Sequence, residues 1–65
     1  DGLLLQRTLV QAAQVDFYNA RNKHAMAKAK QVLAISAADL DLTAECAARY
    51  VYCMSANYIG EPASP

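Results

Sequence analysis

The 65-residue chain carries six basic residues, six acidic residues and one histidine, so its formal net charge is zero. This balance excludes a global field that would attract nucleic acid or an anionic membrane. No run of about 18 apolar residues occurs, and we therefore expect no membrane-spanning segment.

The two glycines and two prolines stand near the chain ends, which leaves residues 3–59 without a helix breaker. We predict an all-α fold, either a small helical hairpin or a three-helix domain (a helix-turn-helix plus one helix). The domain would span residues 1–59 and precede a flexible tail over residues 60–65. A chain this short buries only about 60% of the surface that its unfolded form exposes, so its core would gain from association. Because the sequence opens with Asp1 and not with methionine, we expect a processed, trimmed or partial chain.

The first helix is expected over residues 3–20. Its apolar side is Leu5, Leu9, Ala12, Ala13, Phe17 and Ala20, with Leu3 and Val10 at the edge, opposite Arg7, Gln11, Gln14 and Tyr18. Asp16 falls inside that apolar side. A buried carboxylate must be paired, and Arg21 or Arg49 would supply the cation. We favour a rotation of the helix that leaves Asp16 at a wet margin, and the buried pair is the alternative.

A break at residues 20–23 separates this helix from a second apolar stripe formed by Ala25, Met26, Ala29, Val32 and Leu33. The alternative is one unbroken helix of roughly 33 residues; we favour the break. A basic block, Arg21, Lys23, Lys28 and Lys30, flanks the stripe on both sides. We interpret these residues as side chains whose aliphatic stems cover apolar surface while their charged ends stay in water. A contact with nucleic acid or an acidic partner is the alternative.

The third helix is predicted to begin at a capping box, Ser36 to Asp39, with Asp41 as a competing start. It would run to about Tyr58. The expected inward residues are Ala44, Ala47, Tyr50, Val51, Met54 and Tyr58, and the expected outward ones are Glu45, Arg49 and Tyr52. Glu45 and Arg49 stand four apart in the order that favours an ion pair.

Cys46 and Cys53 lie two turns apart on one side of this helix, so their Cα atoms would be about 10.5 Å apart. That separation exceeds what a disulfide spans, and the two cannot bond within one helix. With His24 as the single histidine and no CxxC pair, we expect no metal site and no cofactor. We interpret the cysteines as core or interface thiols; an intermolecular disulfide across a two-fold axis is the alternative. Two cysteines are too few for a secreted disulfide scaffold, which favours a cytoplasmic location unless the chain is processed and secreted.

Residues 9–58 resemble one and a half tetratricopeptide repeats. The resemblance rests on Ala13, Phe17, Ala20, the turn ARNKHA ending at Ala25, Val32, and Ala47 at 34 positions after Ala13. The chain also departs from the pattern. The residue that lies 34 positions before the aromatic Tyr50 is Asp16. Position 20 is not a glycine, no proline follows the second helix, and the chain has no tryptophan. The resemblance implies peptide or protein binding on a concave side and carries over no catalytic residues.

The predicted function is a non-catalytic interaction or assembly subunit that self-associates or packs against partner helices. The contact residues would be Leu3, Leu4, Leu5, Leu9, Phe17, Tyr50 and Met54, because three consecutive leucines cannot all face one core. The rival function is a nucleic-acid-binding or regulatory hairpin that uses the basic block. No nucleophile, base and orienting group occur at a recognisable spacing. For an active site shared between subunits, the first candidates would be His24, Asp16 and Cys46.

Overall fold

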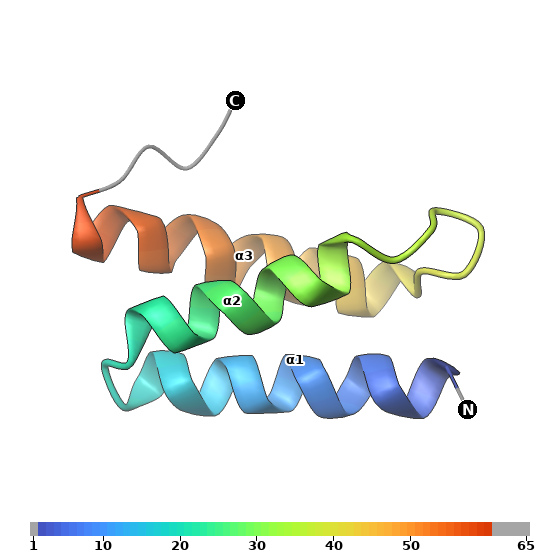
Figure 1. The fold of residues 1–65 in the computed structure, drawn as a ribbon, viewed down its shortest axis with the longest axis horizontal. Coiled ribbons are helices and arrows are strands. Elements are labelled where there is room, and N and C mark those ends of the chain that lie inside the picture. Colours follow the sequence, from blue (N-terminus) through green and yellow to red (C-terminus); the bar gives the residue numbers. More distant parts are fainter. Residues whose placement is uncertain (1, 61–65) are drawn as a thin grey trace.

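The computed structural model describes residues 2–60, which form three α-helices: α1 (Gly2–Tyr18), α2 (Asn22–Leu33) and α3 (Leu42–Ile59). Figure 1 shows that α2 runs antiparallel to both neighbours, so α1 and α3 lie parallel. The all-α prediction is confirmed in its three-helix form. None of the three helices is long and apolar enough to cross a membrane. Most of the predicted tail, residues 61–65, lies outside the described residues.

The turn between α1 and α2 confirms the predicted break, and the single long helix is wrong. The Ala20 amide donates to the Phe17 carbonyl at 3.1 Å, and the Arg21 amide donates to the Asp16 carbonyl at 2.8 Å. These two bonds form a Schellman motif, which needs a left-handed residue at its centre. That residue is Ala20, with φ of 62°. The helix therefore ends at Tyr18, two residues before the predicted end.

The start of α3 is fixed by Asp41 and not by the predicted capping box. The Asp41 side chain accepts from the Ala44 amide at 3.1 Å, as an N-cap does. Ser36 instead begins a turn in which its carbonyl accepts from the amides of Asp39 and Leu40, both at 2.9 Å. The capping box at residues 36–39 is wrong because the backbone of that segment is already bonded as a loop.

Gln6 holds this loop against α1. Its side chain is buried, with Nε2 donating to the Asp39 carbonyl and Oε1 accepting from the Asp41 amide, each at 2.7 Å. Only this orientation of the amide satisfies both backbone partners. The start of α1 is thereby tied to the cap of α3 across more than thirty residues of sequence.

The core consists of small side chains from all three helices: Val10, Ala13, Ala25, Ala29, Val32, Ala44, Ala48 and Val51. The stripe predicted for α2 is confirmed, since Ala25, Met26, Ala29 and Val32 are buried and Leu33 packs against the core.

The predicted inward faces of α1 and α3 are confirmed only in part. Ala13, Ala44 and Val51 are buried, and Leu9, Phe17 and Ala47 pack against the core, but other large side chains expected inside are exposed. Leu5 is 58% exposed, Tyr50 59% and Tyr58 67%, whereas Tyr52, expected outside, packs against the core. Ala20 is also exposed. The buried arcs instead include the polar Gln6, Asp16 and Ser55. A hydrophobicity wheel favours the largest apolar side chains, but helices that approach on alanine have no room for them.

Replacing Ala20 by glycine should stabilise the protein by about 0.5–1 kcal/mol, because glycine adopts the left-handed conformation without the clash of a Cβ. Ala20 is exposed, so its methyl group contributes nothing to the core. Thermal unfolding should show a Tm higher by a few degrees. Ala27→Gly, exposed within α2, is the matched control and should lower the Tm by a similar amount. A Tm for Ala20→Gly at or below the wild-type value would contradict the assignment.

Replacing Gln6 by alanine should destabilise the fold by about 2–4 kcal/mol, because the Asp39 carbonyl and the Asp41 amide both lose their partner. Urea unfolding followed by circular dichroism measures this difference. Gln11→Ala, an exposed glutamine on the same helix, should change stability by less than about 0.5 kcal/mol. Equal effects of the two substitutions would show that the Gln6 bonds do not hold the loop.

Candidate interaction surface

Four aromatic rings form a cluster at one end of the molecule. The centroid of the Phe17 ring lies 5.8 Å from that of Tyr18, 6.3 Å from that of Tyr50 and 5.9 Å from that of Tyr58. Phe17 is half-buried and packs against the core, whereas the three tyrosines are 59–79% exposed. We call these four residues the aromatic cluster. It is a fixed apolar surface with three phenol groups available to solvent.

The parallel course of α1 and α3 brings the cluster together. The last turn of α1 supplies Phe17 and Tyr18. The middle of α3 supplies Tyr50, and its last turn, which ends on the same side in Figure 1, supplies Tyr58. A surface hollow of about 250 Å³ lies beside the rings, lined by Phe17, Tyr18, Ala20, Asn22 and Tyr58. The Asn22 Oδ1 atom is buried there without a hydrogen-bond partner.

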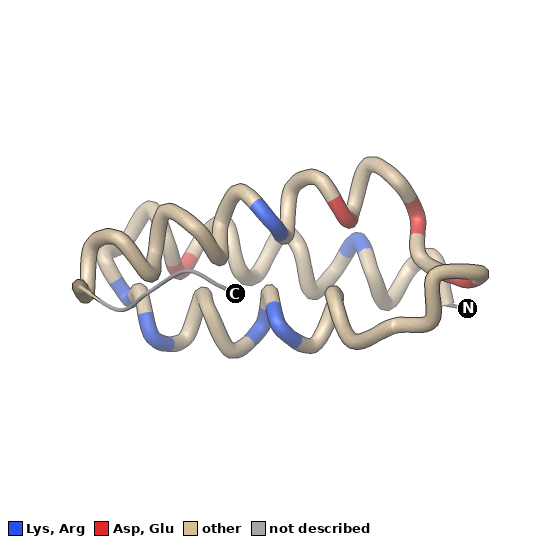
Figure 2. The backbone as a smooth tube through the Cα atoms, turned by 90° about the horizontal axis from the view of Figure 1, so that it is seen from above, with Lys and Arg blue, Asp and Glu red and all other residues tan. Residues whose placement is uncertain are grey.

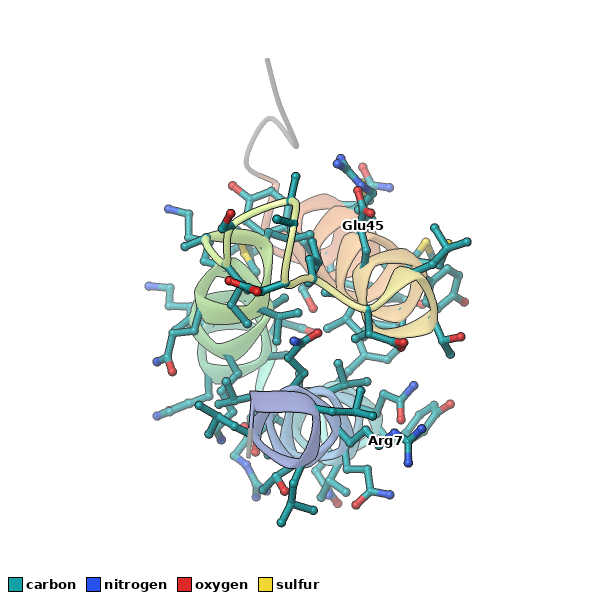
Figure 3. The ribbon with its side chains drawn as sticks, turned by 90° about the vertical axis from the view of Figure 1, so that its right-hand side faces the viewer. Arg7 and Glu45 are labelled. Atoms are coloured by element: carbon teal, nitrogen blue, oxygen red, sulfur yellow. The ribbon has the colours of Figure 1, made fainter. Side chains whose placement is uncertain are left out.

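A second hollow of about 250 Å³ lies between α1 and α3, nearer their first turns. It is lined by Arg7, Val10, Gln11 and Gln14 of α1, by the N-cap residue Asp41, and by Thr43, Ala44 and Ala47 of α3. In Figure 3 the Arg7 side chain projects outward from α1, and Glu45 lies on the side of α3 that faces away from α1. Glu45 pairs there with Arg49, 2.7 Å between Oε2 and Nη2, as the spacing predicts.

The predicted contact residues are divided between two ends of α1. Phe17 and Tyr50 meet in the aromatic cluster, while Leu3, Leu4 and Leu5 are exposed by 39%, 64% and 58% on the first turns. Leu9 packs against the core, and Met54 is half-buried. Sequence reasoning placed Tyr18 opposite the contact face and Tyr58 in the core. The missing information was that α1 and α3 lie parallel, which brings residues near 17 beside residues 50 and 58.

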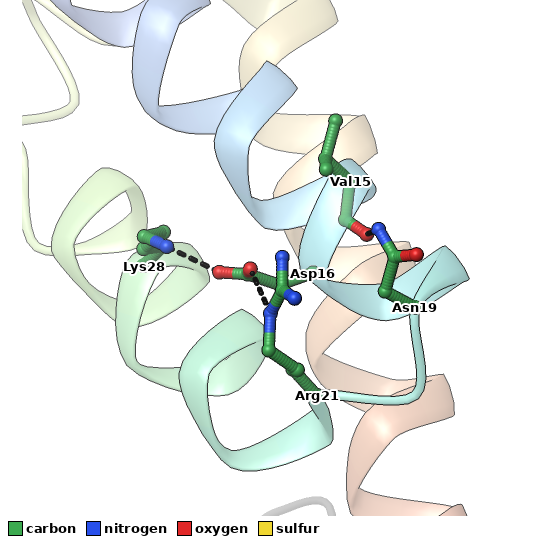
Figure 4. A network of polar contacts seen from close by, with 5 residues as sticks. All are labelled: Val15, Asp16, Asn19, Arg21 and Lys28. Atoms are coloured by element: carbon green, nitrogen blue, oxygen red, sulfur yellow. Dashed lines mark hydrogen bonds and ion pairs between the residues drawn. The ribbon is translucent and has the colours of Figure 1, made fainter.

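Asp16 is buried, and two cations of the basic block pair with it (Figure 4). The Arg21 Nε atom lies 2.9 Å from Oδ1, and the Lys28 ammonium bonds Oδ2. The hydrogen bond from Lys28, then that from Arg21, lowers the pKa of the Asp16 carboxyl against the opposing effect of burial. The favoured wet margin is wrong, because Asp16 is buried. Of the two cations named for the alternative buried pair, Arg21 is a partner and Arg49 is not.

The basic block is therefore divided. Arg21 and Lys28 face Asp16, and the exposed Lys23 and Lys30 border a hollow with Met26, Ala27 and Ile59. Figure 2 shows the basic positions spread along α2 and the acidic ones chiefly near the start of α3. No single stripe of unpaired cations results.

Both cysteines are free and exposed on α3, so the interpretation as core thiols is wrong and the interpretation as interface thiols stays a prediction. Their side of the helix also carries the exposed Leu42, Arg49 and Tyr50. His24 is exposed on α2. Among residues 2–60, no group of three or more histidine, cysteine, aspartate or glutamate side chains is placed to hold a metal ion.

Comparison with known proteins adds no relative: no family model, curated protein or solved structure matches this chain.

The stability that Asp16 contributes should depend on pH in a defined direction. Because folding lowers its pKa, the contribution is fully present above the unfolded value of about 3.9 and is lost as pH falls through the folded value. The wild-type Tm should exceed that of Asp16→Asn near neutral pH, and the difference should shrink below about pH 4. Thermal unfolding of both proteins across this range measures it. Glu45→Gln, which removes an exposed ion pair, should show a much smaller difference. A constant gap between wild type and Asp16→Asn would contradict the assignment.

Proposed function

We propose that the protein is a non-catalytic helical interaction or assembly subunit that self-associates or packs against partner helices through the aromatic cluster. The observation that carries this proposal is the exposure of Tyr18, Tyr50 and Tyr58 around a half-buried Phe17. Protein interfaces are enriched in tyrosine because its ring buries much apolar area while its hydroxyl group still bonds.

The composition of the core supports the same proposal. Alanine and valine bury little area each, so a 65-residue domain with this core is only modestly stable alone. Several larger apolar side chains are exposed, among them Leu4, Leu5 and Leu42. A partner that covered the aromatic cluster would add the apolar burial that the core lacks.

The resemblance to tetratricopeptide repeats fits this proposal. In one and a half repeats the first and third helices would lie side by side, and α1 and α3 do so with Ala13 and Ala47 at the repeat spacing. The concave side would then be the α1–α3 side. The hollow lined by Arg7 and Ala47, the hollow beside Phe17 and the aromatic cluster all occur there.

The rival nucleic-acid function has less support. It would need Arg21, Lys23, Lys28 and Lys30 to act together on phosphates, but two of the four neutralise Asp16.

Light scattering coupled to size exclusion, in reducing buffer at micromolar concentrations, tests the proposal. We expect the wild type to form a dimer or a larger species and the variant Tyr18→Ser, Tyr50→Ser, Tyr58→Ser to be a folded monomer. The control Leu4→Ser, Leu5→Ser removes exposed apolar side chains at the other end of α1 and should leave the assembly intact. A monomeric wild type would contradict self-association, and loss of assembly in the leucine variant alone would move the contact away from the cluster.

A further inference from the structure

Two cations of the basic block, Lys23 and Lys30, are exposed on α2 beside an apolar hollow. The hollow measures about 210 Å³ and is lined by Lys23, Met26, Ala27 and Lys30 of α2 and by Ile59 in the last turn of α3. We call these five residues the lysine face. Met26 is 8% exposed and Ile59 is half-buried, so the floor of the hollow is apolar while both amines reach water.

The lysine face follows one side of α2, a helix that carries basic positions along its length (Figure 2). Lys23 and Lys30 are seven residues apart, so they project within about 20° of one another and about 10.5 Å apart along the axis. Met26 and Ala27 lie three and four residues after Lys23, and they therefore fall between the two amines on the same side. The result is an apolar strip with a cation at each end.

Both amines lack a carboxylate partner. Within residues 2–60, the ion pairs use the other cations, namely Arg21, Lys28 and Arg49. Lys23 also stands in the first turn of α2, where the helix dipole disfavours a positive charge. That turn contains no acidic residue, and the N-cap of α2 makes no side-chain capping bond. A carboxylate bound at Lys23 thus offsets an unfavourable charge as well as forming an ion pair.

We propose that the lysine face binds a helix of a partner protein that carries two carboxylates seven residues apart, with large apolar side chains between them. The carboxylates pair with Lys23 and Lys30, and an apolar side chain enters the hollow over Met26. Carboxylates seven residues apart on a helix have the same axial spacing as the two lysines, so both ion pairs form in one alignment. The partner helix runs antiparallel to α2, because the positive end of each helix dipole then lies beside the negative end of the other.

A second copy of this chain does not fit the lysine face. Among the described helices, α1 carries Asp16 alone, α3 carries Glu45 alone and α2 carries no acidic residue. Asp16 is buried, and Glu45 already bonds Arg49. No helix of residues 2–60 therefore presents two free carboxylates seven residues apart. The inference rests on the proposed packing against partner helices, but it adds a second surface and states the chemistry of its partner.

Nucleic acid fits this surface less well than an acidic helix does. The lining of the hollow includes no aromatic ring on which a base could stack. Two amines make only two phosphate contacts, which support weak binding. The apolar floor gains instead from an aliphatic side chain that leaves water.

A designed peptide tests the proposal. The probe is an alanine-based helix of about 16 residues that has two glutamates seven residues apart and two leucines between them. The control peptide has the same composition, but its glutamates are five residues apart and lie on opposite sides of the helix. Fluorescence anisotropy of labelled peptides at low salt should show about fivefold tighter binding of the probe, since the control peptide loses one exposed ion pair. Equal affinities would overturn the proposal.

An exchange of charges completes the test. The variant Lys23→Glu, Lys30→Glu should bind the glutamate probe at least about tenfold more weakly than the wild type. It should bind the same peptide with lysines in place of glutamates as tightly as the wild type binds the probe. The variant should stay folded, because both positions are exposed and an acidic residue in the first turn of α2 offsets the loss of a cation in the last turn.

The matched control is Arg49→Gln, which removes an exposed cation outside the lysine face and should leave the affinity for the probe within about twofold. Failure of the exchanged pair to bind would overturn the proposal. A tighter complex with a single-stranded DNA of about 16 nucleotides than with the probe would overturn it as well.

This result is independent of the aromatic cluster. The variant Tyr18→Ser, Tyr50→Ser, Tyr58→Ser keeps the lysine face and should bind the probe as the wild type does. Probe binding by a monomeric wild type would support the lysine face and contradict self-association. An assembled wild type that does not bind the probe would overturn the lysine face alone.

Discussion

The close approach of three helices on alanine is the constraint on which the rest of this molecule depends. Ala13 of α1, Ala25 and Ala29 of α2 and Ala48 of α3 are almost fully buried, and no aromatic ring shares their level of burial. Alanine loses little conformational entropy on folding, but it leaves no space between helices for a larger side chain. Phe17 can enter only in part, and Tyr18, Tyr50 and Tyr58 remain outside around it. The aromatic cluster is therefore a consequence of how the core is packed.

A core of small side chains fixes the positions of helices weakly, and two buried polar groups supply what is missing. Gln6 near the start of α1 holds the loop before α3. Asp16 near the end of α1 bonds Arg21, the residue before α2, and Lys28 within α2. Losing these partners would be unfavourable for both side chains, because a buried amide or carboxylate without its hydrogen bonds is costly. Polar contacts therefore fix the position of α1 at both of its ends. The small apolar side chains between them do not have to fix it.

This division between apolar and polar contacts explains which parts of the fold could be predicted from the sequence. Apolar spacing was enough for α2, whose buried stripe includes Ala25 and Val32. The sequence named Arg21 as a partner for Asp16 only if the carboxylate was buried, and its burial depends on the rotation of α1. The rotations of α1 and α3 were not predictable from hydrophobicity, because their buried arcs contain Gln6 and Ser55 while Leu5 and Tyr58 are exposed. Gln6 makes its bonds to backbone atoms, which no side-chain pattern records. In the same way, the left-handed Ala20 carries no signal, since glycine is the residue that marks such a position. The candidate surface needed the parallel packing of α1 and α3, a tertiary property.

Tyr50 shows how the candidate surface depends on the core. Its ring centroid lies 6.3 Å from that of Phe17, and Phe17 itself packs against the buried alanine and valine side chains. The position of the exposed Tyr50 ring is therefore set by a side chain that the core holds. A larger side chain in the core would displace Phe17, because a close-packed interior has no spare volume. The shape of the aromatic cluster thus depends on the small residues beneath it.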